Sequence, residues 1–193
     1  MPRTEPTPDV GGVPHATMLV FIFTDAVVEQ AVLARSLTEA SEVTFNACSV
    51  DGDTSTNDTV IAMASGASGK SPSEAALTTA LTKVCDVLAR SMVADGEGAN
   101  HVAEIRVKGL ASRADAKAAA KTIATSLLVK TMLFGEDANW GRLLAAAGRA
   151  GVAFDPRRAD YHSMAGDVPD RQRLLRILTS FKGRELRAVC FGF

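Results

Sequence analysis

Thr17 is the residue of this sequence best suited to act as a nucleophile. It stands between Ala16 and the apolar segment 18–23, with Gly11 and Gly12 upstream. A threonine hydroxyl is a weak nucleophile until a base takes its proton. Cleavage before Thr17 would leave a free α-amine beside that hydroxyl, and such an amine, with an ordinary pKa of about 8, suits a general base. The small residue before Thr17 and the glycines behind it are compatible with self-cleavage, although on spacing alone an ordinary threonine at a strand start is the simpler interpretation.

A second set of chemically capable residues lies in the polar segment 49–59. Asp51, Asp53 and Asp58 have a spacing that suits a Ca²⁺ or Mg²⁺ site, but the EF-hand pattern of glycine and glutamate does not complete it. His15 directly precedes the Ala-Thr pair, and a catalytic role for it is a further alternative.

The composition argues against several classes of protein. A formal net charge of -1, with one Trp and one Tyr, does not favour a dedicated nucleic-acid binder. The longest apolar run, residues 18–23, is far short of a membrane span. We therefore expect a cytoplasmic protein with no nucleic-acid or membrane partner. The cysteines lie too far apart for a zinc site and are odd in number, which indicates thiols in a reducing compartment: Cys48, Cys85 and Cys190.

Segments with strand and helix patterns alternate along the chain, so the expected class is α/β or α+β. The continuous apolar run 18–23 predicts a strand buried on both faces, and a short strand is expected at 60–64. Segment 101–108 alternates apolar and polar residues, which predicts a strand with one wet face. The polar residues of that face are Glu104, Arg106 and Lys108.

Capping signals predict where the helices begin. The expected openings are Thr24 and Asp25 for the first helix, Ser71, Pro72 and Glu74 for the second, and Ser112 and Asp115 for the third. A last short helix is expected at 140–149.

The composition changes after residue 156. Residues 157–193 hold eight Arg or Lys against four Asp or Glu, a net of +4, so the total of -1 leaves -5 for residues 1–156. An amphipathic helix is predicted at 171–180 and a short strand at 185–191. A basic surface that faces solvent or a partner is the preferred interpretation, with nucleic-acid binding as the minor alternative.

The sequence resembles the ornithine acetyltransferase (glutamate N-acetyltransferase, ArgJ-like) family at four places in the right order. They are PHATMLVFIFTDA, SVDGDTSTNDTV, DGEGA and LVKTMLFGEDANWGRLLAAAGRAG, at residues 14–26, 49–60, 95–99 and 128–151. The resemblance implies an α/β (α+β) sandwich of the DmpA/ArgJ-like, self-processing N-terminal-nucleophile type. It also implies cleavage between Ala16 and Thr17, after which Thr17 carries an acetyl group from N-acetylornithine to glutamate.

The same resemblance assigns substrate binding to Glu136, where a carboxylate suits the amino group of ornithine. Its neighbours have structural interpretations: Asn139 as the cap of the last helix, and Arg142 as a brace that holds the loop through a carboxylate. The resemblance implies no metal and no cofactor, so the aspartate-rich segment 49–59 is expected to be a hydrogen-bonded loop near Thr17.

The resemblance also divides the chain into a leader (1–16), a β-chain domain (17–156) and a divergent basic tail (157–193). The family's N-terminal half supplies a Thr-Gly oxyanion hole and a substrate-binding Lys, so an α-type chain or another copy is expected as partner and as cover for exposed sheet edges. Two alternatives stay open. One is a catalytically silent, truncated family member or interaction subunit, and the other is a related amidohydrolase or aminopeptidase.

Overall fold

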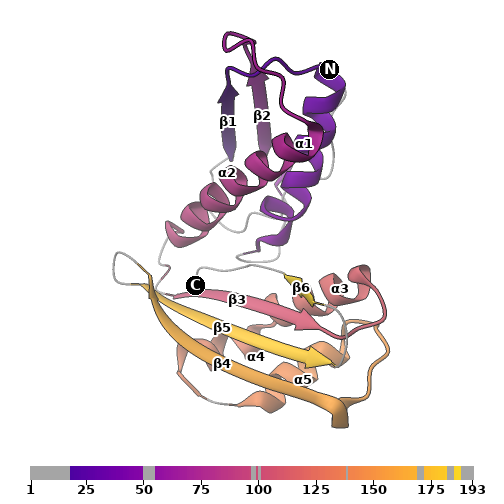
Figure 1. The fold of residues 1–193 in the computed structure, drawn as a ribbon. Coiled ribbons are helices and arrows are strands. Elements are labelled where there is room, and N and C mark those ends of the chain that lie inside the picture. Colours follow the sequence, from indigo (N-terminus) through magenta and orange to yellow (C-terminus); the bar gives the residue numbers. More distant parts are fainter. Residues whose placement is uncertain are drawn as a thin grey trace.

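The computed structural model of the protein describes residues 18–49, 55–96, 99, 101–137, 139–168, 172–181 and 185–187. Figure 1 shows two lobes, one above the other. The first lobe contains strands β1 (Leu19–Thr24) and β2 (Thr59–Ala64), helices α1 (Gln30–Glu42) and α2 (Glu74–Ala94), and the short 3-10 helix η1 (Phe45–Ala47).

The second lobe is a four-stranded sheet with helices packed against it. Its strands are β3 (His101–Lys108), β4 (Ala159–Val168), β5 (Gln172–Phe181) and β6 (Glu185–Arg187), in the order β4-β5-β3-β6. Its helices are α3 (Arg113–Ala124), α4 (Leu127–Phe134), α5 (Trp140–Gly148) and the 3-10 turn η2 (Pro156–Arg158). No helix in the described part of the chain has the length and apolarity that crossing a bilayer requires.

The sheet of the first lobe is covered on one face. β1 and β2 pair in parallel with Leu19 opposite Thr59, and their inward residues pack against the core beneath α1 and α2. The outward residues are between 37% and 70% exposed: Leu19, Phe21, Phe23, Ile61 and Met63. The predicted strands are confirmed, but burial of the first strand on both faces is wrong for this chain, because its two helices cover only one side.

The predicted wet face of β3 is also wrong. Glu104 is 1% exposed, and its carboxylate accepts hydrogen bonds from Arg106 Nε at 2.5 Å and Arg90 Nη1 at 3.4 Å. Arg90 comes from α2, so this ion pair links the two lobes. Alternation alone did not reveal the burial, because a paired carboxylate can lie in an interior where an unpaired one cannot.

The basic tail forms strands where a helix was predicted. β5 (Gln172–Phe181) runs parallel to β3 from Arg173 opposite His101 to Ser180 opposite Lys108, and antiparallel to β4. The apolar residues of this segment are compatible with the period of a helix and with that of a strand. Its position between two strands favours the extended form. The tail therefore completes the sheet of the second lobe.

Two of the three predicted helix openings need correction. Ser112 caps α3 as predicted, with its hydroxyl accepting from Asp115 N at 3.1 Å. α2 is capped by Ser73 instead of Ser71, and α1 begins only after Glu29, because Thr24 is the last residue of β1 and Asp25 starts the loop that follows. At this strand end the Thr24 hydroxyl accepts from Ala26 N at 3.2 Å.

Candidate functional site

The first described residue, Met18, is anchored at the end of the aspartate-rich segment. Its backbone N–H donates to Asp58 Oδ1 at 2.8 Å, and its carbonyl accepts from Thr59 N at 2.9 Å. Ala16 and Thr17 lie outside the described residues. The carboxylate of Asp58 therefore holds the main chain at Met18, the residue that directly follows the candidate nucleophile in the sequence.

Asp58 is buried with one of its oxygens unsatisfied. The residue is 7% exposed, and Asp58 Oδ2 has no hydrogen-bond partner within the described part of the chain. Asp51 and Asp53 lie outside that part, and in it no group of three His, Cys, Asp or Glu side chains is placed to hold a metal ion. The arrangement provides a negatively charged acceptor at the start of β1.

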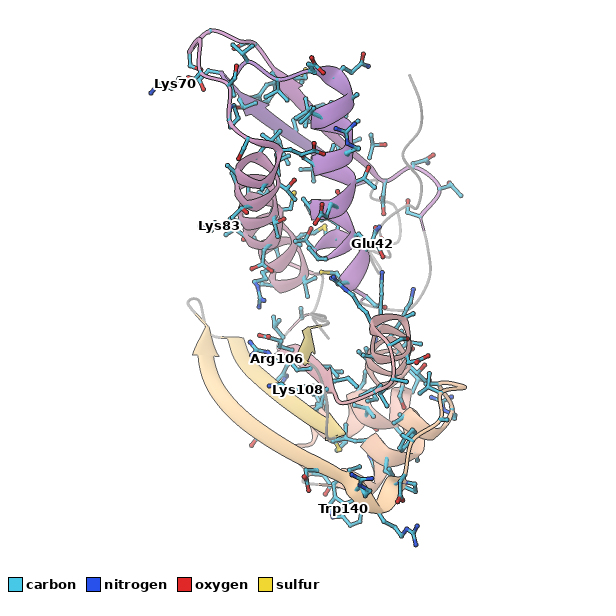
Figure 2. All side chains as sticks on the ribbon, turned by 45° about the vertical axis from the view of Figure 1, so that its right-hand side comes forward. Glu42, Lys70, Lys83, Arg106, Lys108 and Trp140 are labelled. Atoms are coloured by element: carbon cyan, nitrogen blue, oxygen red, sulfur yellow. The ribbon has the colours of Figure 1, made fainter. Side chains whose placement is uncertain are left out.

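Helix α1 ends beside the second lobe. Glu42, its last residue, forms an ion pair with Lys117 of α3 and accepts from Asn46 Nδ2 at 2.8 Å, and Figure 2 shows Glu42 above the helix of the second lobe. Burial raises the pKa of the Glu42 carboxyl, but the hydrogen bonds from Lys117 and Asn46 outweigh it and hold that pKa below its ordinary value. The charge of Glu42 is thus already matched.

Glu136 occupies a strained position at the end of α4. Its φ of 52° makes it the only non-glycine residue with positive φ among the described residues. Gly135 is the C-cap, Glu136 N donates to Leu133 O at 3.2 Å, and Asp137 N donates to Met132 O at 3.0 Å. This is a Schellman motif whose left-handed position is usually taken by glycine. A glutamate there is exposed and held in place by the backbone.

The residues after Glu136 hold the loop in place. Asn139 is the N-cap residue of α5, as expected, although its side chain makes no capping hydrogen bond. Arg142 braces the loop, but through Leu128 O at 3.2 Å and the Thr131 hydroxyl at 3.3 Å instead of a carboxylate.

The two parts of the candidate site lie in different lobes. Asp58 and Met18 belong to the first lobe, whereas Glu136 lies in the second, four residues before Trp140. Figure 2 shows Trp140 at the end of the second lobe that points away from the first. The structure therefore places Asp58 at the start of β1 in the first lobe and Glu136 just after the end of α4 in the second lobe.

The structure describes some of the remaining histidines and cysteines. His15 and Cys190 lie outside the described residues, and His101 contacts Phe134 edge to face with ring centroids 6.0 Å apart. Cys48 and Cys85 are buried free thiols, and burial raises the pKa of Cys85 to about 11. A thiol with that pKa is not a nucleophile near neutral pH.

By its spacing in the sequence, Asp58 was recognisable only as one of three possible metal ligands. A more specific signal was available in the two apolar strands. If segments 18–23 and 59–64 pair in parallel, the residues just before them must meet, which places Asp58 beside Met18.

Comparisons with known proteins agree with the four matching segments. The ArgJ family model matches residues 8–174. An "Arginine biosynthesis bifunctional protein ArgJ" of Desulfotalea psychrophila is 54% identical over 151 residues, 75% of this chain and 38% of that protein. A "Glutamate N-acetyltransferase" of Methanocaldococcus jannaschii is 49% identical over 148 residues, 76% of this chain and 37% of that protein. The chain thus spans less than two fifths of the length of these curated relatives.

A solved structure extends the agreement to the fold. The crystal structure of the arginine biosynthesis bifunctional protein argJ from Bacillus halodurans matches with a TM-score of 0.82 and 32% identity, over 92% of this chain and 95% of that one. The expected α/β class of the ArgJ-like N-terminal-nucleophile type is therefore confirmed. The family match extends to residue 174, past residue 156, where the resemblance by motif ended. On the extent of these matches, the chain belongs to the ArgJ family.

Proposed function

We propose that this chain is the β-type part of a cytoplasmic glutamate N-acetyltransferase of arginine biosynthesis, with Thr17 as its nucleophile. The observation that carries the proposal is the family match across residues 8–174, which contains Thr17 and Glu136. The 49% identical relative is named a glutamate N-acetyltransferase, and the tether of Met18 to Asp58 gives the start of β1 a defined partner.

The proposed reaction has two acyl transfers. Hydrolysis of the Ala16–Thr17 bond, which consumes one water, first frees the α-amine of Thr17 and leaves Ala16 with a carboxylate. Thr17 Oγ then attacks the acetyl carbon of N-acetylornithine as the α-amine takes the Oγ proton. A bond forms from Oγ to the acetyl carbon, the bond from that carbon to the ornithine nitrogen breaks, and the proton passes to the departing amine. The amine of glutamate then attacks the ester, its proton returns to Oγ by the same route, and N-acetylglutamate leaves.

An α-type chain is the proposed partner. The open face of the β1–β2 sheet exposes large apolar side chains, Phe23 most of all at 70%, which a stable protein normally covers. The curated relatives are more than twice as long as the matched segment, so they contain residues that this chain does not. The partner would cover the sheet and supply the donors that stabilise the oxyanion of each acyl transfer.

Glu136 is proposed to bind the amino group of ornithine. Its carboxylate is exposed and its backbone is held by the Schellman motif, which fixes where the side chain starts. Because it lies in the second lobe, this role requires that the lobe, or another copy of the chain, presents Glu136 to Thr17.

Intact mass tests the proposal. The purified chain, alone and with an α-type partner, is incubated with N-acetylornithine, and Thr17→Val serves as the control. We expect a species that begins at Thr17 and gains one acetyl group, which glutamate then removes. Acetate release without glutamate would favour the amidohydrolase or aminopeptidase alternative. An uncut, unmodified chain under both conditions would refute the proposal and favour a silent family member or interaction subunit.

A further inference from the structure

A buried carboxylate oxygen beside the start of β1 lacks a partner. Asp58 is 93% buried, its Oδ1 holds Met18 N–H at 2.8 Å, and its Oδ2 accepts no hydrogen bond from the described residues. An ionised carboxylate in that state is unstable unless a cation or further donors approach it. The charged side chains described where α1 and α3 meet, Glu42 and Lys117, are paired with each other.

Covalent geometry brings one specific nitrogen within reach of this oxygen. The nitrogen of Thr17 is joined to Met18 N through two carbon atoms, so the two nitrogens lie about 3 to 4 Å apart whatever the main-chain torsion. The two oxygens of a carboxylate are about 2 Å apart, and a carboxylate can accept from two neighbouring donors at once. With Oδ1 on Met18 N, Oδ2 is free for the nitrogen of Thr17.

We propose that Asp58 orients the α-amine of Thr17 and stabilises the ammonium that this amine becomes when it takes the Oγ proton. The inference rests on the proposed function, since it needs Thr17 to be an N-terminal nucleophile. Asp58 is then a positioning residue that acts through the base. The arrangement follows the general logic of a nucleophile, a base and a third group that holds the base.

One proton passes between Thr17 and the substrate in the proposed transfer. The proton moves from Thr17 Oγ to the α-amine and on to the departing ornithine nitrogen, and Asp58 exchanges no proton in these steps. Before cleavage the nitrogen of Thr17 is a neutral amide and cannot serve as a cationic partner for the Asp58 carboxylate. Cleavage creates that cation, and the inference therefore places the matched ion pair only in the cut chain.

The first test measures the α-amine directly in the cut wild-type protein. Labelling with ¹⁵N-threonine gives the N-terminal nitrogen a resonance apart from the amides, and its titration gives the pKa. A carboxylate in contact raises the pKa of a neighbouring amine by about 1 to 3 units. We expect a value clearly above the ordinary value of about 8. A value at or below that figure would overturn the inference, and this measurement needs no variant to fold.

The second test compares Asp58→Asn with Glu39→Gln. Asparagine keeps the acceptor for Met18 N–H and removes the charge, while Glu39, exposed on α1 of the same lobe, undergoes the same carboxylate-to-amide change away from the site. Asp58→Asn should lower the α-amine pKa by about 1 unit or more, and move the acid limb of the acetylation rate to lower pH by the same amount. The rate on the plateau should fall on the order of 100-fold. Glu39→Gln should change neither.

The outcomes separate the inference from the function on which it rests. If wild-type protein is cut and acetylated while Asp58→Asn has the wild-type amine pKa and pH profile, only the role of Asp58 is refuted. If Asp58→Asn loses rate without any shift of the acid limb, Asp58 supports the structure alone and the inference is again refuted. If the wild-type chain is never cut or acetylated, the proposed function itself fails.

Discussion

Replacing Glu136 by glycine should stabilise the protein while removing its proposed substrate contact. Glu136 has a φ of 52° in the left-handed position of the Schellman motif that ends α4. A residue with a Cβ is strained there by roughly 1 to 2 kcal/mol, and glycine is not. Glycine is also more flexible than alanine in the unfolded chain, which lowers the free energy of unfolding by about 0.4 to 1 kcal/mol. Glu136→Gly should therefore be more stable than Glu136→Ala by about 0.5 to 1 kcal/mol.

The comparison with alanine isolates the backbone. Both variants lose every interaction of the glutamate side chain, and they differ only in the Cβ atom at the left-handed position. Urea unfolding at equilibrium measures the difference directly, and for a chain of this size it corresponds to roughly 1 to 4 °C in Tm. An alanine variant as stable as the glycine variant, or more stable, would refute the assignment of strain to this position.

A second readout connects the strain to function. In the acetylation assay both variants should raise the KM for N-acetylornithine by a similar factor, because both lack the carboxylate. A glycine variant that is more stable and binds substrate poorly would show that glutamate occupies this position for its function. A glycine variant with the wild-type KM would refute the proposed role of Glu136.

Three further expectations concern the rest of the molecule. Glu104→Gln leaves two arginines without their buried charge partner and should lower the free energy of unfolding by roughly 3 kcal/mol, measured in urea; a loss below about 1 kcal/mol would contradict the buried ion pair. Lys117→Met removes the partner that keeps the pKa of Glu42 lowered in the folded state, so the stability difference from wild type should be present at neutral pH and vanish as the pH falls through that lowered pKa. The Glu42 and Lys117 side chains are both more than 40% exposed, so the difference in free energy of unfolding should stay below about 1 kcal/mol. A difference that grows as the pH falls would contradict this prediction. Phe21→Lys, on the open face of β1, should weaken association with an α-type chain or another copy in sedimentation velocity without lowering stability; equal association of wild type and variant would exclude that face as the interface.

The sequence predicted most strands of this fold because their patterns are local. The run 18–23 and the alternation 101–108 correspond closely to β1 and β3, and the Ser112 signal correctly opens α3. The errors arose where a distant element decides the outcome. Nothing local in segment 171–180 shows that it lies between β3 and β4, and nothing local in β3 shows that Arg90 of α2 reaches its glutamate.

The candidate site divides in the same way. The type of residue at Thr17 and the motif around Glu136 could be recognised in the sequence, but the placement of Asp58 depends on the parallel register of β1 and β2. The left-handed backbone of Glu136 was also beyond prediction, because glycine is the usual signal for that conformation and here it stands one residue earlier, at Gly135.

Three features of this chain have a free-energy cost that its own described contacts do not offset: the left-handed backbone of Glu136, the unsatisfied oxygen of Asp58 and the open apolar face of β1 and β2. The buried carboxylate of Glu104, by contrast, accepts hydrogen bonds from two arginines. Such unrelieved positions are expected where a ligand, a partner or a covalent change completes the structure. In our proposal Glu136 binds substrate, Asp58 binds the α-amine of the cut chain, and a partner chain covers the apolar face. In the alternative of a silent family member nothing would offset the strain of Glu136, so the stability and the KM of Glu136→Gly distinguish that alternative from the proposed acetyltransferase.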